Sequence, residues 1–403
     1  MKKPLSTRDG FFTGVVEYWR NINSKSQKLR FQVSVFRFQC SCFSSLTPDT
    51  RHLKPPSRLE GTSKHVIDFS MENDLRECIL CEHRCGVDRL AGDLGVCRMS
   101  TPVVASRTLH PAPPQSYTIF VAGCNFKCLG CQNWTISQYP DNRMAVDGYV
   151  EPGSLARESV RMIQSTSGTL MGADRIFFSG GEPTIHLPFI EKVVDEARRL
   201  SSNLKVNFDT NGFMTEESLH RVLGFTTSLT FDIKAFYDDT MRAISGTPVG
   251  PILRNAEIVA RTASDKLWEY RIVAIPEVNE EDIEPLCRFL ASISKKLPVA
   301  FLAFRPNYVL DEHHGATREL MKKCVELARG AGLRNVSYAG MINIPGKKGV
   351  LLKEVEGVYE RAGAKLAASY ARSKGCTNHP RNCGDCPSMS ECPLKKYIPM
   401  RSC

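Results

Sequence analysis

The amino-acid sequence predicts an α/β protein, with a partial (β/α)6 barrel between an N-terminal four-cysteine metal knuckle and a C-terminal helical, cysteine-rich extension. Three observations lead to this prediction. Short β-branched runs alternate with amphipathic stretches after residue 115, which is the rhythm of a parallel sheet. The cysteines gather in groups, and acidic residues follow several of the predicted strands. Parallel strands end at one rim, so chemistry is expected there.

The first 65 residues are expected to lie outside the core, as a disordered or non-native extension. They hold 12 Lys and Arg against 4 Asp and Glu, which accounts for most of the chain's net charge of +10. The remaining body is nearly neutral, which argues against a nucleic-acid surface. Such a composition fits an organelle transit peptide, a disordered arm or translated upstream sequence. No run of about 18 apolar residues is present, so no membrane partner is expected.

A four-cysteine module is expected next, over 66–115, and the barrel core over 116–310. Its predicted strands are 116–123, 174–181, 204–212, 228–235, 270–276 and 299–306. Between them, apolar residues recur near a period of 3.6, which predicts helices at 151–164, 187–200, 215–225, 250–262 and 280–294. The extension, 311–375, is predicted to hold helices over 317–333 and 351–374, before a cysteine-rich tail at 376–403.

The chain has 16 cysteines in close spacings and no secretory signal. This combination favours metal thiolates in a reducing cytoplasm over a disulfide framework. We therefore expect a cytoplasmic, oxygen-sensitive protein.

The loop after the first predicted barrel strand carries three cysteines, Cys124, Cys128 and Cys131, in the spacing CxxxCxxC. A [4Fe–4S] cluster that only moves electrons takes four thiolates. Three thiolates leave one iron open to a chelating ligand. The alternative is a site completed by a distant fourth ligand, or a zinc site.

Further motifs follow the next strands: Gly180-Gly181-Glu182-Pro183, then DTNG at 209–212 and DIK at 232–234. Together with CxxxCxxC, these residues resemble the radical S-adenosylmethionine (SAM) superfamily, in its pyruvate formate-lyase activating enzyme branch. The resemblance implies a [4Fe–4S] cluster whose open iron is chelated by SAM. One electron from the cluster then splits SAM to a 5′-deoxyadenosyl radical.

The resemblance also assigns roles to residues. Gly180, Gly181 and Glu182 would hold the SAM amine and Lys234 would contact SAM. The residues expected around a monovalent cation are Asp209, Thr210 and Asp232. Arg271 fits the family's arginine position, whereas Pro276-Glu277 replaces a Pro-Gly pair and the last predicted strand ends in FRPNY, without the usual histidine. These departures leave the substrate open.

Two further cysteine groups predict metal sites. The four at the N-terminal side, Cys78, Cys81, Cys85 and Cys97, can close around zinc, a rubredoxin-like iron or another cluster, with a structural role expected. The four in the tail, Cys376, Cys383, Cys386 and Cys392, form a possible third site, because a metal would supply the order that packing cannot. A mobile tail is the alternative.

An enzyme is the expected function, with hydrogen abstraction from a carbon of a partner protein as its reaction. It would need an electron donor such as ferredoxin or flavodoxin. The added cysteines and the extension also resemble archaeal cobalamin-dependent C-methyltransferases that modify a glutamine of methyl-coenzyme M reductase, although no DxHxxG cobalamin motif is present. A hypothesis of another class is a metal-stapled binding or electron-transfer module, which leaves the motifs at the strand ends unexplained.

Overall fold

The computed structural model describes residues 69–141, 145–347, 352–355, 358–378 and 381–399. Every described residue belongs to one compact unit. The predictions for 1–65 therefore lie outside the described residues. In the described part, no helix is long and apolar enough to cross a membrane.

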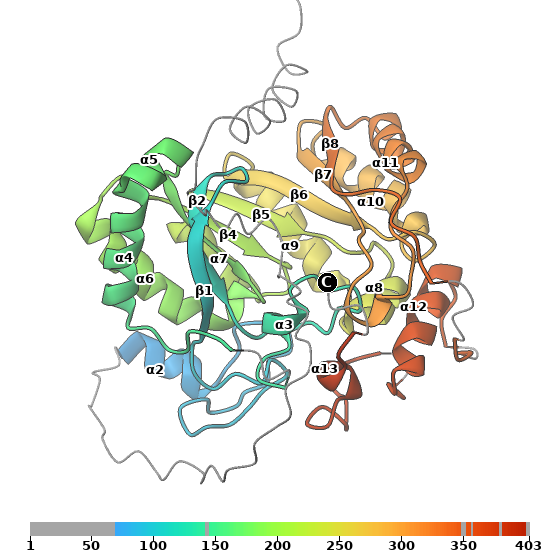
Figure 1. Cartoon of the computed structure of the whole chain (residues 1–403), viewed down its shortest axis with the longest axis horizontal. Coiled ribbons are helices and arrows are strands. Elements are labelled where there is room, and N and C mark those ends of the chain that lie inside the picture. Colours follow the sequence, from blue (N-terminus) through green and yellow to red (C-terminus); the bar gives the residue numbers. More distant parts are fainter. Residues whose placement is uncertain (1–68, 142–144, 348–351, 356–357, 379–380, 400–403) are drawn as a thin grey trace, which may run out of the picture. The chain divides into compact units, whose positions relative to one another are not determined.

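One eight-stranded sheet, in the order β1 to β8, organises the fold (Figure 1). Its strands are β1 (Val104–His110), β2 (Ser116–Val121), β3 (Arg175–Gly180), β4 (Lys205–Thr210), β5 (Ser228–Asp232), β6 (Leu267–Ala274), β7 (Pro298–Ala303) and β8 (Asn335–Ala339). β1 pairs with β2 in the antiparallel sense, and every later pair is parallel. Among the described strands, β1 and β8 are the edges, so this sheet is open.

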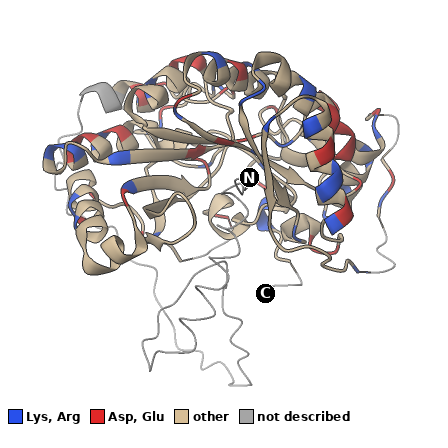
Figure 2. Ribbon diagram, turned by 90° about the horizontal axis from the view of Figure 1, so that it is seen from above, with Lys and Arg blue, Asp and Glu red and all other residues tan. Residues whose placement is uncertain are grey.

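Helices connect the strands and cover the sheet. They are α2 (Phe69–Arg76), α3 (Trp134–Ser137), α4 (Pro152–Gln164), α5 (Thr166–Met171), α6 (Leu187–Leu200), α7 (Glu216–Phe225), α8 (Asp238–Ser245), α9 (Gly250–Thr262), α10 (Glu280–Ile293), α11 (Arg318–Gly330), α12 (Ala362–Ser373) and α13 (Pro393–Lys396). Two 3-10 turns, η1 (Pro183–His186) and η2 (Tyr308–Leu310), follow β3 and β7. Acidic and basic residues are interspersed along the outer helices (Figure 2).

Local sequence explains where several helices begin. The Glu151 carboxylate accepts hydrogen bonds from the N–H groups of Gly153 and Ser154, with Pro152 in the first turn of α4. Thr215 and Thr317 cap α7 and α11 in the same way through their hydroxyl groups. These contacts satisfy N–H groups that have no partner inside the helix.

The six predicted barrel strands and the five helices between them are confirmed in position. The predicted number of parallel strands, six, was one short, because β8 continues the parallel sheet. The antiparallel strand β1 was not predicted. The helix predicted over 351–374 was too long. Residues 352–355 and 358–361 are not helical, and α12 begins only after Arg361, whose N–H donates to Asp239 Oδ2 at 3.1 Å. This side-chain anchor holds the chain outside the helix. The predicted partial barrel remains a prediction.

The hydrophobic core runs through the whole described unit, from Leu80 to Leu394. Strands such as β2 are buried along almost their full length, as expected for parallel strands covered on both faces. A smaller apolar cluster packs the four-cysteine module against the loops after β2 and β3; its buried members are Cys97, Met99, Val103, Ala105, Ala122 and Ile185. The module is thus built onto the end of the sheet where the motifs lie.

Candidate active site at the carboxyl ends of the strands

The CxxxCxxC loop follows β2 and is fixed by backbone hydrogen bonds on both sides. Lys127 N–H donates to the Ser245 carbonyl at 2.9 Å, and Leu129 N–H donates to the Ile244 carbonyl at 3.0 Å, so the loop lies on the end of α8. Val309 N–H, after β7, donates to the Leu129 carbonyl at 2.9 Å. The loop therefore has a defined path among three different elements.

The three cysteines of this loop, Cys124, Cys128 and Cys131, are the kind and number of donors that a [4Fe–4S] cluster with one open iron takes, although as placed their sulfurs are not close enough together to hold a metal ion. All three are free thiols. Burial is the main cause that raises the pKa of each thiol. Negative charge on Cys128 raises the pKa of Cys124 further, and negative charge on Cys131 raises that of Cys128. Such thiols become thiolates readily only when a cation is bound. Polar groups already face two of the sulfurs: Phe126 N–H lies 3.3 Å from Cys124 Sγ, and Ser137 Oγ lies 3.2 Å from Cys131 Sγ.

The two glycines after β3 are required by a close approach to the loop after β2. A Cβ atom on Gly181 would stand 1.7 Å from the Gly123 carbonyl oxygen. Gly180 has φ +112°, in the region that favours glycine, and its Cβ would stand 2.4 Å from the Val121 carbonyl oxygen. The glycines therefore bring the GGE motif against the start of the CxxxCxxC loop.

Glu182 joins the ends of β3 and β4 and is only 1% exposed. Its Oε1 accepts hydrogen bonds from the backbone and hydroxyl of Thr184 at 3.1 and 2.6 Å and from the Thr210 hydroxyl at 2.8 Å. Its Oε2 accepts the Asn211 N–H at 2.8 Å. Burial raises the pKa of Glu182, and these donors oppose that rise. The carboxylate thus accepts hydrogen bonds from both Thr210 and Asn211 and braces the DTNG segment.

Asn211, in turn, reaches the cysteine loop. Its Nδ2 donates to Asn125 Oδ1 at 2.7 Å and lies 3.9 Å from Cys124 Sγ. Asn133 Nδ2 donates to the Gly180 carbonyl at 2.9 Å from the other end of the same loop. These asparagines were not among the predicted site residues. Asn125 and Asn133 flank the cysteines in CNFKCLGCQN, and that position was the available signal.

A charged group lies beside this loop on β4, β5 and β6. Arg271 Nη1 stands 3.4 Å from Asp209 Oδ1 and 3.9 Å from Asp232 Oδ1, and Arg271 Nη2 stands 3.1 Å from Glu269 Oε1. Lys234 Nζ lies 3.2 Å from Asp232 Oδ2. The structure thus brings together four of the predicted residues, whereas the Thr210 hydroxyl turns to Glu182. Arg271 stands between the two carboxylates that were expected to ring a cation.

Electrostatics in this group follow from burial and pairing. Burial raises the pKa of Asp209 to about 6, although Arg271 lowers it. Burial lowers the pKa of Lys234, but the charges of Asp232 and Cys128 outweigh that effect, so its pKa is raised. Lys234 therefore remains an ammonium group that faces the cysteine loop, where an anionic ligand would be attracted.

Glu277 occupies the position at which the resembling family has glycine. Its φ is 59°, in the left-handed region that glycine favours. The Glu277 N–H donates to Glu280 Oε1 at 2.9 Å, and the His313 ring contacts the Pro276 carbonyl at 2.9 Å. The backbone shape of a Pro-Gly pair is thus kept without the glycine.

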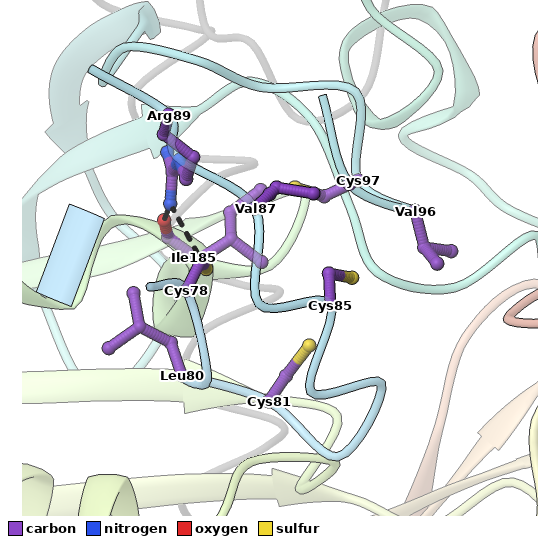
Figure 3. Close-up of a pocket in the computed structure, with 10 residues that line it drawn as sticks. Cys78, Leu80, Cys81, Cys85, Val87, Arg89, Val96, Cys97 and Ile185 are labelled. Carbon is purple, nitrogen blue, oxygen red and sulfur yellow. Dashed lines mark hydrogen bonds between the residues drawn. The ribbon is translucent and has the colours of Figure 1, made fainter. Parts of the chain in front are cut away.

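The N-terminal cysteines, Cys78, Cys81, Cys85 and Cys97, line one small cavity of about 10 Å³ (Figure 3). This is room for about one water-sized atom. Arg89 also lines the cavity, and its Nη1 lies 3.9 Å from Cys78 Sγ. No three His, Cys, Asp or Glu side chains in the described part of the chain lie close enough together, as placed, to hold a metal ion.

This four-cysteine module contacts all three loops of the site. His83 Nε2 lies 2.9 Å from the Asn125 carbonyl in the cysteine loop. Arg89 Nη1 donates to the Ile185 carbonyl at 2.7 Å, just beyond GGEP, and Glu82 N–H donates to the Phe213 carbonyl at 3.2 Å, just beyond DTNG. His83 is half-buried, and burial lowers its pKa to about 4.

In the tail, three of the four predicted cysteines share one neighbour. Burial lowers the pKa of the Arg381 guanidinium, but negative charge on Cys383, Cys376 and Cys392 outweighs that effect, so its pKa is raised. Cys386 follows Cys383 by three residues and is partly buried. The tail also reaches η2, where the Tyr308 hydroxyl donates to the Leu394 carbonyl.

Comparison with known proteins gives the following similarities. Residues 118–290 match the radical SAM superfamily. An uncharacterized protein of Methanocaldococcus jannaschii is 26% identical over 285 residues, which are 67% of this chain and 80% of that protein. A pyruvate formate-lyase-activating enzyme of Staphylococcus aureus is 27% identical over 195 residues, 45% of this chain and 71% of that enzyme. The solved structure of Streptococcus suis SuiB bound to S-adenosylmethionine covers 55% of this chain and 46% of that one, at 14% identity and a TM-score of 0.37.

Proposed function

We propose that this protein is an iron–sulfur enzyme that abstracts a hydrogen atom from a carbon of a partner protein or peptide. The proposal starts from the match of residues 118–290 to the radical SAM superfamily. The observation that carries the proposal is the convergence of CxxxCxxC, GGE, DTNG and DIK on neighbouring strand ends. The similarity to an enzyme named for activating pyruvate formate-lyase supports a protein or peptide as the substrate.

Each residue of the site would have a separate role in binding the cluster or SAM. The thiolates of Cys124, Cys128 and Cys131 would hold a [4Fe–4S] cluster. Bound together, the cluster and SAM supply a 5′-deoxyadenosyl radical that removes a hydrogen atom from carbon. Phe126 N–H and Ser137 Oγ, which face two sulfurs, would stabilise their negative charge and so influence the reduction potential.

Lys234 would attract the SAM carboxylate, because its ammonium group stays charged beside the cysteine loop. Glu182 would act as a positioning residue, since four donors already occupy its carboxylate. The SAM amine would then be held by backbone oxygens of the GGE segment. Asp209, Asp232 and Arg271 would form the charged wall of the pocket, with Arg271 balancing the two carboxylates.

The four-cysteine module would hold a second metal, zinc or iron, in a structural role. Arg89 supports this proposal: its guanidinium is 2% exposed, and its Nε and Nη2 have no hydrogen-bond partner among the described residues. A buried cation needs a negative partner, and four thiolates around a divalent ion keep a net negative charge. To close around one ion, the thiols would have to turn inward by side-chain rotation.

The test is SAM cleavage by protein purified without oxygen from cells supplied with cobalamin. With a one-electron reductant such as ferredoxin or flavodoxin, we expect 5′-deoxyadenosine from the wild-type chain and none from Cys128→Ala. Product from both chains, or from neither, would overturn the proposal. A corrinoid spectrum beside the iron–sulfur bands would instead support the methyltransferase, and zinc without SAM cleavage would support a binding or electron-transfer module.

The substrate class can be tested with perdeuterated cell extract separated into protein and small-molecule fractions. Deuterium in 5′-deoxyadenosine after incubation with the protein fraction is the expected result. Deuterium only from the small-molecule fraction would exclude a protein or peptide substrate.

A further inference from the structure

The cysteine-rich tail lies against the same helix end as the CxxxCxxC loop. Cys383 N–H donates to the Gly246 carbonyl at 2.8 Å, immediately after α8. The loop docks on the preceding residues, through Lys127 N–H to the Ser245 carbonyl and Leu129 N–H to the Ile244 carbonyl. The tail and the loop are therefore neighbours, although they are far apart in sequence.

Arg381 lies between the two cysteine groups and is 1% exposed. Its Nη1 donates to the Ala243 carbonyl at 2.7 Å, and its Nη2 donates to the Lys127 carbonyl at 2.5 Å. Its Nε has no hydrogen-bond partner among the described residues. Burial raises the pKa of the Cys128 and Cys383 thiols, and the charge of this guanidinium opposes that rise at both. One buried cation thus faces both groups of thiols.

Lys127 adds a second buried positive charge at this place. Lys127 is 3% exposed, and its ammonium group donates to the carbonyl oxygens of Cys124 at 3.1 Å, Val96 at 3.2 Å and Phe126 at 3.4 Å. Lys395 nearby is paired with Asp141 at 2.6 Å. In the part of the chain that the structure describes, no carboxylate pairs with Lys127 or Arg381.

Two buried cations without carboxylate partners require another source of negative charge, because isolated buried charges are strongly unfavourable. With the cluster of the proposed function bound, the CxxxCxxC thiolates would supply part of it on one side. On the other side, burial raises the pKa of the Cys383 thiol, and the charges of Arg381 and Lys127 oppose that rise. Neutral thiols carry no charge, whereas thiolates that bind a metal keep a net negative charge.

The backbone is shaped to admit the Cys383 sulfur at this position. Gly246 ends α8 with φ +82°, and a Cβ atom there would stand 2.2 Å from Cys383 Sγ and 3.6 Å from Arg381 Nη2. Only glycine combines this conformation with this approach. The sulfur therefore lies directly beside the helix end and the guanidinium.

We propose that Cys376, Cys383, Cys386 and Cys392 hold an anionic metal–thiolate centre, zinc or an iron–sulfur cluster, whose negative charge compensates Arg381 and Lys127. As placed, no three described thiols are close enough to hold an ion, so the tail side chains turn inward when the metal binds. Cys386 joins through the CxxC spacing with Cys383. The centre is independent of the proposed SAM chemistry, because metal binding is measured without SAM.

The first test measures zinc, iron and sulfide in a background in which Cys124, Cys128 and Cys131 are all replaced by alanine. We expect Cys383→Ala/Cys392→Ala to lower the metal content by one centre. The matched control is Cys287→Ala/Cys324→Ala, two fully buried cysteines outside the groups, which leaves it unchanged. Loss of zinc without sulfide identifies zinc, and equal loss of iron and sulfide identifies a cluster. Equal metal content in both variants overturns the proposal.

A second test uses the wild-type chain and so does not depend on the folding of a variant. The thiols are alkylated before and after metal removal by a chelator, and each modified cysteine is located by mass spectrometry. We expect the metal-bound tail thiolates to be alkylated about tenfold more slowly before chelation than after it, or more slowly still. The same rate before and after metal removal, with circular dichroism unchanged, contradicts the proposal.

Discussion

Replacing Glu182 by glutamine tests whether the GGE carboxylate positions the site or contacts SAM. Glutamine can keep Oε1 for Thr184 and Thr210, but its amide NH₂ then faces the Asn211 N–H that Oε2 accepts at 2.8 Å. One charge-assisted hydrogen bond is lost and a buried donor loses its acceptor. The reverse orientation places the amide against three donors, so it is no better.

The expected loss of stability follows from those contacts. A buried donor without an acceptor costs about 1–3 kcal/mol, and a hydrogen bond to a charged group contributes about 1.5–3 kcal/mol. These two energies describe partly the same lost contact and are not added in full, so we expect Glu182→Gln to lower the free energy of unfolding by about 2–4 kcal/mol. Asn211, released from Oε2, would also loosen Asn125 in the cysteine loop, and SAM affinity would fall with stability.

The assay is anaerobic denaturant unfolding together with SAM binding by calorimetry. The matched control is Glu284→Gln, on the exposed face of α10, where the carboxylate pairs with Arg288 at 2.6 Å. This control is expected to change stability by about 0.5 kcal/mol or less. If Glu182→Gln unfolds at the same denaturant concentration as Glu284→Gln, the bracing role is refuted. Unchanged stability with weaker SAM binding would show direct contact with SAM, as the sequence predicted.

Three further predictions follow from single side chains. Burial raises the pKa of Asp282 from 3.8 to about 6. The contribution of Asp282 therefore favours the folded state below pH 4 and is lost as the pH rises through 6. Asp282→Asn should remove about 3 kcal/mol of this pH dependence of stability, as measured by thermal unfolding at several pH values. An unchanged slope would exclude Asp282 as its source. The backbone of Glu277 has φ 59°, in the left-handed region. Glu277→Gly should therefore change the free energy of unfolding by no more than about 1 kcal/mol, whereas Glu277→Val should lower it by about 1–2 kcal/mol. Equal stability of the two variants would contradict the left-handed conformation. Lys234→Met should weaken SAM binding by about tenfold or more with cluster iron retained, and loss of iron with affinity unchanged would refute the contact.

The sequence was informative where chemistry is carried by short local patterns. The periodicity located every parallel strand of the predicted core, and strand ends placed Asp209, Asp232 and Lys234 near one another. It was uninformative where the geometry depends on partners distant in sequence. No local pattern indicates that Asp239 holds Arg361 outside α12. Nor does any local pattern indicate that the Glu182 carboxylate accepts hydrogen bonds from Thr210 and Asn211, at the end of β4.

β8 and β1 were missed for a similar reason. β8 is an exposed edge strand, so its residues show no apolar alternation, and its pairing with β7 is what defines it. β1 lies in the cysteine-rich module and pairs with β2 in the antiparallel sense. Strand propensity depends on the neighbouring strand and on burial more than on the local residues, and at an edge these signals are weakest.

The three cysteine groups were assigned to separate parts of the chain, yet Lys127 connects them. Its ammonium group contacts the Val96 carbonyl next to Cys97 and the Cys124 carbonyl in the CxxxCxxC loop, and its own carbonyl accepts from Arg381, 254 residues away in the sequence. A change of charge at any group would therefore act on the same buried ammonium. Because buried charges interact strongly at short range, and if the CxxxCxxC loop and the tail hold the centres proposed above, loss of metal from the tail should alter the reduction potential of the CxxxCxxC cluster even with all of its own ligands intact.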